Sequence, residues 1–153
     1  MTGLHQHERS EVIDVVNRVA LLADAREWDA LATCFDAEVE VDYTSEFGGA
    51  VKRLTPSELM REWAWLGRFR ATQHDVTSHV VDIDGEHARC RAHVRSTHFA
   101  DGERGEGFWT CWGNYDYRLR RTEVGWKVAS TRFTLTAWRG NPEINAEARG
   151  ERV

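Results

Sequence analysis

Hydrophobic residues recur at helical spacing in the first part of the chain. From Ser10 onward, apolar positions repeat every three or four residues, while charged and amide side chains fall on the opposite face. Asp24 lies at the border of this apolar stripe, near the predicted end of the helix. Residues 27–35 continue as a shorter helical segment. We therefore expect two helices, with Asp24 either solvated or turned toward the core.

The middle of the chain predicts a strand and then a third helix. Residues 39–45 are rich in β-branched side chains that alternate with polar ones, which is typical of a strand. The glycine pair after Phe47 indicates a turn. The sequence from Thr55 to Glu58 predicts a helix start, with threonine as the N-cap, proline at the first helical position and glutamate closing a capping box. We expect this helix to run to about Gly67.

The second half of the chain carries strand signals. Two alternating segments flank Asp84-Gly85, a dipeptide favoured in tight hairpin turns, and residues 108–121 and 125–138 predict two further strands. Between residues 88 and 98, small or apolar side chains occupy one face and arginines dominate the other. Helices followed by antiparallel strands predict an α+β domain whose strongly bent sheet closes over a helix.

Length and composition narrow the class of protein. A chain of 153 residues is the size of one domain, and its net charge of −5 is spread along the sequence, which argues against a nucleic-acid surface. The three cysteines lack paired spacing, and no apolar run is long enough to span a membrane. We expect a cytoplasmic protein with one domain over residues 8–140 and flexible tails at residues 1–7 and 141–153.

Three polar residues fall at positions that the pattern marks as inward: Asp24, His74 and His98. Burying such groups without partners is costly, so they usually pair or take part in chemistry. An aspartate that accepts a hydrogen bond from one imidazole nitrogen leaves the other nitrogen free to act as a base. The alternatives are a solvated Asp24 and histidines that are merely hydrogen-bonded in the core.

Motifs for metals and cofactors are missing from the sequence. His74, His79 and His98 lack the accompanying carboxylate or cysteine spacing of a metal site, so we expect no metal. The glycine-rich signatures of nucleotide binding are also missing, so we expect no cofactor.

Five segments resemble, in order and spacing, the SnoaL-like branch of the nuclear transport factor 2-like superfamily, and within it the scytalone dehydratases. The segments are ADAREWDAL, VDYTS, ATQHDVTS, STHF and GNYDYRLRR followed by GWKV, and the similarity covers about residues 8–140. The resemblance implies a cone, also described as a cystatin-like roll, in which a bent antiparallel or mixed sheet and helices enclose one pocket. It also implies homodimers or homotrimers formed through the outer sheet face.

The resemblance further implies which residues form the site. The aspartate and histidine of the dehydratases match Asp24 and His74, and their pocket tyrosine matches Tyr43. Their second histidine matches His98, and their substrate-binding asparagine matches Asn114 if a one-residue gap is allowed.

The chain also departs from that pattern at two positions. Ala23 replaces a second tyrosine, and Trp112 replaces a serine. We therefore expect the substrate to differ from that of the dehydratases. The two replacements do not argue against acid–base chemistry in general.

The first hypothesis is a cofactor-independent dehydratase, isomerase or cyclase acting on a small, mostly apolar, oxygenated molecule. His74, oriented by Asp24, would remove a proton from the carbon next to a carbonyl group. Tyr43 and Asn114 would stabilise the enolate oxygen, and His98 would act as the acid.

Two alternatives come from other classes of protein. The second hypothesis is a binding module that holds a hydrophobic ligand against Trp63, Phe69 and Trp112 without chemistry. A third is an accessory subunit of an oxygenase. The family contains enzymes and plain binding domains, so the fold alone does not choose among the three.

Overall fold

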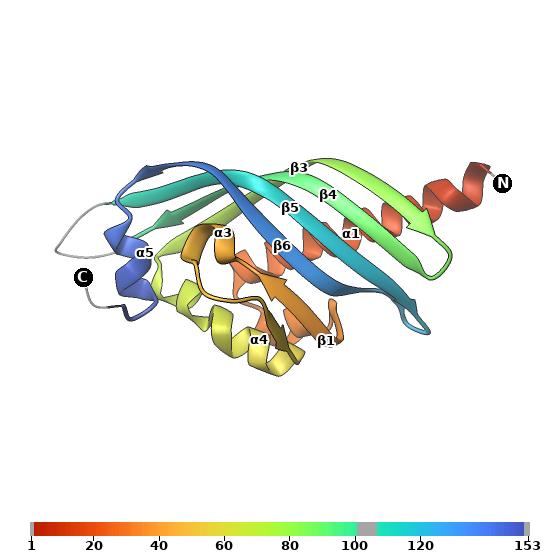
Figure 1. Ribbon diagram of the computed structural model, residues 1–153, viewed down its shortest axis with the longest axis horizontal. Helices are drawn as coiled ribbons and strands as arrows, with labels where there is room; N and C mark the ends of the chain where they lie inside the picture. Colours follow the sequence, from red (N-terminus) through yellow and green to blue (C-terminus); the bar gives the residue numbers. More distant parts are fainter. Residues whose placement is uncertain (1, 101–106, 152–153) are drawn as a thin grey trace.

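A bent six-stranded sheet packs on a long N-terminal helix and several short ones (Figure 1). The computed structural model describes residues 2–100 and 107–151. The helical elements are α1 (Thr2–Ala25), α2 (Trp28–Ala32), α3 (Thr44–Phe47), α4 (Pro56–Trp63), the 3₁₀ helix η1 (Ala64–Arg68) and α5 (Glu143–Ala148). The strands are β1 (Phe35–Asp42), β2 (Lys52–Leu54), β3 (Ala71–Asp84), β4 (His87–Phe99), β5 (Phe108–Thr122) and β6 (Gly125–Gly140).

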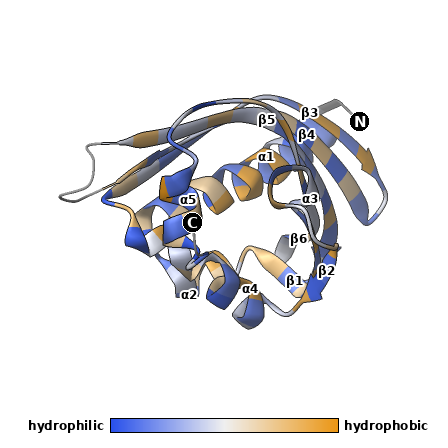
Figure 2. Ribbon diagram, turned by 60° about the vertical axis from the view of Figure 1, so that its left-hand side comes forward, coloured by the Kyte–Doolittle hydropathy of each residue, from blue (hydrophilic) through white to orange (hydrophobic). Residues whose placement is uncertain are grey.

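The sheet is mixed, with the strand order β2-β1-β6-β5-β4-β3. The strands from β3 to β6 form an antiparallel meander, and β1 joins its free edge by pairing in parallel with β6. The helices lie on the concave side, inside the curve of the sheet (Figure 2). This arrangement confirms the predicted α+β class and the bent sheet closed by helices on one side.

Strand alternation determines which side chains enter the core. Along β4, the six residues predicted to share one face are all buried: Ala88, Cys90, Ala92, Val94, Ser96 and His98. The same alternation of hydrophobic and hydrophilic residues is visible along β3 and β4 in Figure 2. On the outer face, arginines pair with aspartates of neighbouring strands, as in the Arg89–Asp116 and Arg95–Asp75 ion pairs.

Within the described residues, both end segments contain helix where flexible tails were expected, while Met1 and residues 152–153 lie outside the described part of the chain. Helix α1 begins at Thr2 instead of near Ser10, and its early turns are tied down by an ion pair between Glu8 and Arg121. At the other end, residues after Pro142 form α5, where Asn145 and Ala148 are buried. The segment is mostly charged, so its composition did not predict that these two residues are buried against the rest of the protein.

The middle of the chain also differs in detail. The strand predicted over residues 39–45 ends at Asp42, because the Asp42 carboxylate accepts hydrogen bonds from the Thr44 backbone N–H (3.1 Å) and hydroxyl (2.7 Å) and turns the chain into α3. The capping box at Thr55 is present as predicted, but α4 ends at Trp63 and η1 continues as a 3₁₀ helix. None of the described helices combines the length and apolar character needed to cross a membrane.

Candidate active site

The bent sheet and the helices enclose a cavity of about 440 Å³, within the size range of small-molecule sites. Its wall is mainly apolar and aromatic, with contributions from β1, α4, η1 and β6. The polar and titratable groups in the wall include Tyr43, Glu46, His74, His98 and Tyr115. A few polar groups in a mainly apolar wall are typical of a small-molecule site.

Asp24 and His74 meet at the wall of this cavity. His74 Nδ1 lies 2.7 Å from Asp24 Oδ1, and the His74 backbone N–H donates to Asp24 Oδ2 at 2.8 Å. The Thr72 hydroxyl donates to Asp24 Oδ1 at 2.9 Å. The Asp24 side chain is only 17% exposed, so the structure brings the two residues together and Asp24 is not the solvated residue that the pattern alone allowed.

This geometry sets the tautomer of His74. Carboxylate oxygens can only accept, so the imidazole proton sits on Nδ1 and the lone pair sits on Nε2. His74 lines the cavity, and Nε2 is the ring nitrogen left for a ligand. The carboxylate therefore fixes the orientation of the imidazole ring.

His98 lies next to His74 on the adjacent strand β4, with its ring centroid 5.7 Å from that of His74. It packs against the rings of Phe69 at 5.0 Å and Trp65 at 5.8 Å, and it is 4% exposed. Burial, with a smaller effect of nearby His74, lowers the pKa of His98 to about 3. His98 is therefore a neutral imidazole near pH 7, suited to hydrogen bonding more than to carrying a proton as an imidazolium acid.

Two phenols face the cavity: Tyr43 lies between β1 and α3, and Tyr115 lies on β5. Tyr43 stacks on the Phe133 ring at a centroid distance of 6.1 Å, and Tyr115 packs on the same ring at 5.6 Å. Burial raises the pKa of both tyrosines, so both keep their protons and can donate hydrogen bonds. Sequence reasoning found Tyr43 but missed Tyr115, which the alternation within residues 108–121 could have placed on the inner face.

The structure corrects three predicted ligand contacts. Trp112 and Asn114 alternate with the buried residues of β5 and lie on the outer sheet face, in a separate hollow with Asp75 and Arg95. Their predicted contacts with a ligand in the cavity are wrong, because a shift of one residue exchanges the two faces of a strand. Phe69 lies behind His98 and does not line the cavity.

Trp63 is the predicted aromatic contact that the structure places in the cavity wall. It lies at the end of α4, and its ring meets Tyr43 edge-on at a centroid distance of 6.2 Å. It is therefore positioned to contact a ligand beside the Tyr43 phenol.

Sequence reasoning also missed Glu46 and Arg149. Glu46 enters the cavity wall from α3, and Arg149 follows α5 at the C-terminal end of the chain. Burial raises the pKa of Glu46 to about 7, although the Arg149 guanidinium, the Trp109 indole and His74 oppose that rise. Glu46 is thus a second titratable group in the same cavity as His74.

Other reactive chemistry is limited in the part of the chain that the structure describes. No three histidine, cysteine or acidic side chains are grouped closely enough there to hold a metal ion. Cys111 lines the cavity, but burial, reinforced by the charge of Glu46, raises the pKa of its thiol to about 12. The thiol therefore stays protonated and is a poor nucleophile.

Comparison with known proteins places the chain in a family. The structure of the Kfla4162 protein from Kribbella flavida is 29% identical, with a TM-score of 0.86 over 95% of this chain and 99% of that one. A Novosphingobium aromaticivorans protein provisionally named scytalone dehydratase is 20% identical, with a TM-score of 0.78 over 91% of each chain.

The hexachlorocyclohexane dehydrochlorinase LinA-type3 from Novosphingobium barchaimii is 12% identical, with a TM-score of 0.73 over 90% of this chain and 92% of its own. At identities this low, the enzyme shares the fold with this chain and nothing more is shown. A search of curated proteins finds none that matches.

A model of the SnoaL-like domain family matches residues 5–132. Because that match spans most of the chain, this protein belongs to the SnoaL-like domain family of the nuclear transport factor 2-like superfamily.

Proposed function

We propose that this protein is a cofactor-independent enzyme that removes a proton from a carbon next to a carbonyl group in a small, mostly apolar molecule. The observation that carries the proposal is the 2.7 Å contact between His74 Nδ1 and Asp24 Oδ1 at the wall of the cavity. A base needs a free lone pair facing the substrate, and this contact leaves Nε2 in that role. Dehydration, isomerisation and cyclisation all begin with this step.

The proton transfer builds negative charge on the carbonyl oxygen of the substrate. Donors that are already in place stabilise such charge without reorganising during the reaction. Tyr43 and Tyr115 are protonated phenols in the same cavity, and we assign them this role in place of the outward-facing Asn114. Neutral His98 supplies a further hydrogen-bonding group beside His74.

The names of related structures support this class of reaction. One neighbour is provisionally named a scytalone dehydratase and another a dehydrochlorinase, and both names describe eliminations. Elimination next to an activating group needs a base and an apolar pocket, and this chain has both.

Exchange of carbon-bound hydrogen for solvent deuterium tests the proposal without knowledge of the natural substrate. Small aryl and alkyl ketones are incubated with the protein in D₂O, and loss of the α-proton signal is followed by NMR. His74→Ala should slow exchange about 10²–10⁴-fold, the usual contribution of a general base. His93→Ala is the matched control, because His93 is an exposed histidine on the outer face of β4.

The proposal fails if His74→Ala exchanges as fast as the wild type while both remain folded by circular dichroism. It also fails if the wild type binds ketones tightly but exchanges none of them, a result that would indicate a binding module.

A further inference from the structure

Glu46 is held firmly in the cavity wall. Helix α3 is a single turn, but the Asp42 carboxylate accepts hydrogen bonds from the Thr44 backbone N–H and hydroxyl at its start. The Ser45 hydroxyl accepts a hydrogen bond of 2.9 Å from the Leu135 backbone N–H of β6. These contacts fasten α3 to the sheet, and in the view of Figure 1 α3 lies between β6 and α5. The Glu46 carboxyl therefore has a defined place beside the ligand space.

The carboxyl group of Glu46 is not neutralised by a cation. Arg149 is the cation whose charge acts on it most, but Arg149 forms a 2.7 Å ion pair with Glu151 and lies 3.9 Å over the Phe47 ring. Among residues 2–100 and 107–151, Glu46 itself forms no ion pair within 4.0 Å. A carboxylate in such a site is costly, so the protonated form persists near neutral pH, in line with its pKa of about 7.

The remaining groups around Glu46 do not compete for its proton. It interacts with His74 of β3, with Tyr43 at the end of β1, and with Trp109, Cys111 and Tyr115 of β5. The thiol and the two phenols keep their own protons because burial raises their pKa values. Among these neighbours, Glu46 and His74 are the groups left to exchange protons with a substrate; Lys52, Glu62, His98 and Glu151 also line the pocket.

We propose that Glu46 is the general acid of this site, and that it protonates the oxygen that leaves the β-carbon of the substrate. This inference rests on the proposed function, because it supplies the acid for the proton removal that His74 begins. Two titratable groups with different environments in one cavity are the usual basis for dividing base and acid roles.

The elimination balances with these two residues. His74 Nε2 takes the α-proton, and the C–H electron pair forms the enolate. The enolate then collapses, the electrons form the carbon–carbon double bond, and the bond from the β-carbon to its hydroxyl oxygen breaks. Glu46 gives its proton to that oxygen, so water leaves. Proton transfer from the imidazolium of His74 to the carboxylate of Glu46 restores the starting state.

The dependence of the elimination rate on the leaving group shows whether Glu46 acts as an acid or has only a structural role. A β-hydroxy ketone needs a proton to expel its oxygen, whereas the matching β-acetoxy ketone does not. We expect Glu46→Gln to slow elimination about 10²–10⁴-fold with the hydroxy ketone. Elimination from the acetoxy ketone and α-deuterium exchange should stay near wild-type rates in the same variant.

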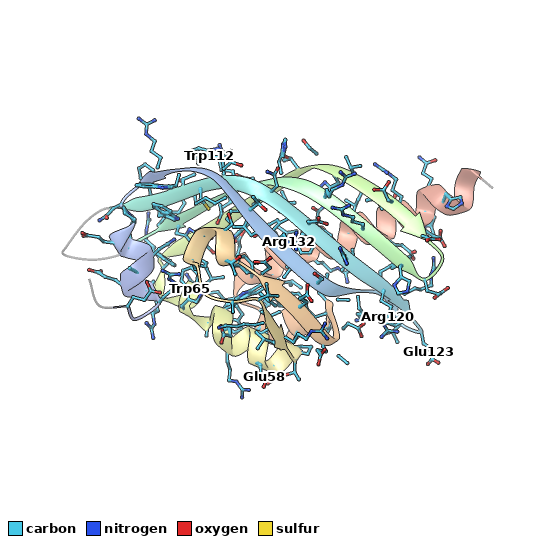
Figure 3. All side chains as sticks on the ribbon, in the orientation of Figure 1. Glu58, Trp65, Trp112, Arg120, Glu123 and Arg132 are labelled. Carbon is cyan, nitrogen blue, oxygen red and sulfur yellow. The ribbon has the colours of Figure 1, made fainter. Side chains whose placement is uncertain are left out.

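Glu123→Gln is the control for loss of a carboxylate. Glu123 lies in the turn between β5 and β6, at the opposite end of the molecule from Trp65 of the cavity wall (Figure 3). This variant should match the wild type with both ketones.

Arg149→Met provides a second readout. Loss of the cation should raise the pKa of Glu46 further, and the alkaline limb of kcat/KM for the hydroxy ketone should move to higher pH. Equal slowing of both ketones by Glu46→Gln, or no slowing of either, would overturn the role of Glu46 alone. Absence of α-exchange in the wild type would instead overturn the proposed function, and the acid with it.

Discussion

Replacing Asp24 by asparagine should inactivate the base by moving one proton. Asp24 Oδ2 accepts from the His74 backbone N–H at 2.8 Å, and Oδ1 accepts from His74 Nδ1 at 2.7 Å. A backbone N–H can only donate, so the amide oxygen of asparagine must take the place of Oδ2. The amide nitrogen then faces His74 Nδ1, which must accept. The imidazole proton is thereby forced onto Nε2, the atom that has to act as the base.

The magnitude of the effect follows from this exchange. Loss of a positioned general base lowers the reaction rate about 10²–10⁴-fold. A substitution that changes the tautomer but not the shape of the site should lie at the upper end of that range. In serine protease triads, the equivalent substitution lowers kcat about 10⁴-fold. The Thr72 hydroxyl can rotate to accept from the new amide, so the number of contacts is kept. Loss of charge assistance in these bonds should lower the free energy of unfolding by about 1–3 kcal/mol.

Two measurements on the same variant check the reasoning. The α-deuterium exchange rate reports on the base, and ¹⁵N NMR of the imidazole reports which nitrogen of His74 carries the proton. Asp75→Asn is the matched control, because Asp75 is the next residue on β3 and pairs outward with Arg95. The reasoning is refuted if Asp24→Asn keeps exchange within a few-fold of wild type, or if the proton remains on Nδ1.

Two further predictions concern packing and pH. A Cβ on residue 113 would lie 2.4 Å from both the Phe133 ring and the Thr134 carbonyl, so Gly113→Ala should lower the free energy of unfolding by about 1–3 kcal/mol. Because the Phe133 ring stacks on Tyr43, the same variant should also raise the KM for the substrate. An unchanged midpoint of urea unfolding would contradict this prediction. The pKa of His98 is lowered from 6.5 to about 3, so its contribution to stability is complete above pH 6.5 and is lost as the pH falls toward 3. His98→Phe should flatten the fall in stability over that window, whereas parallel pH profiles of wild type and variant would speak against a buried neutral imidazole.

The parts of the site that sequence reasoning found lie on long, regular elements. The alternation of β4 placed His98 inward, and helical periodicity together with the family resemblance placed Asp24 beside His74. Tyr43 was found through the family resemblance, and the structure places it directly after β1.

The parts that were missed have little local signal. Glu46 stands in a one-turn helix, too short for periodicity to reveal, and Arg149 follows a charged segment that resembles a tail. Asn114 was placed on the wrong face because its match needed a one-residue gap, and strand alternation has a period of two. The parallel pairing of β1 with β6 joins residues far apart in sequence, and the residue pattern within either strand does not predict it.

That parallel pairing also has a consequence for how the protein is made. Phe35 aligns with Val128 and Asp42 with Arg132, so β1 cannot take its place in the sheet until β6 has left the ribosome. The hairpins from β3 to β6 can form earlier, since local contacts form faster than distant ones. Tyr43 and Glu46 are carried at the end of β1, so they join the dyad only when this last strand docks. During refolding, recovery of activity should therefore lag behind formation of the meander.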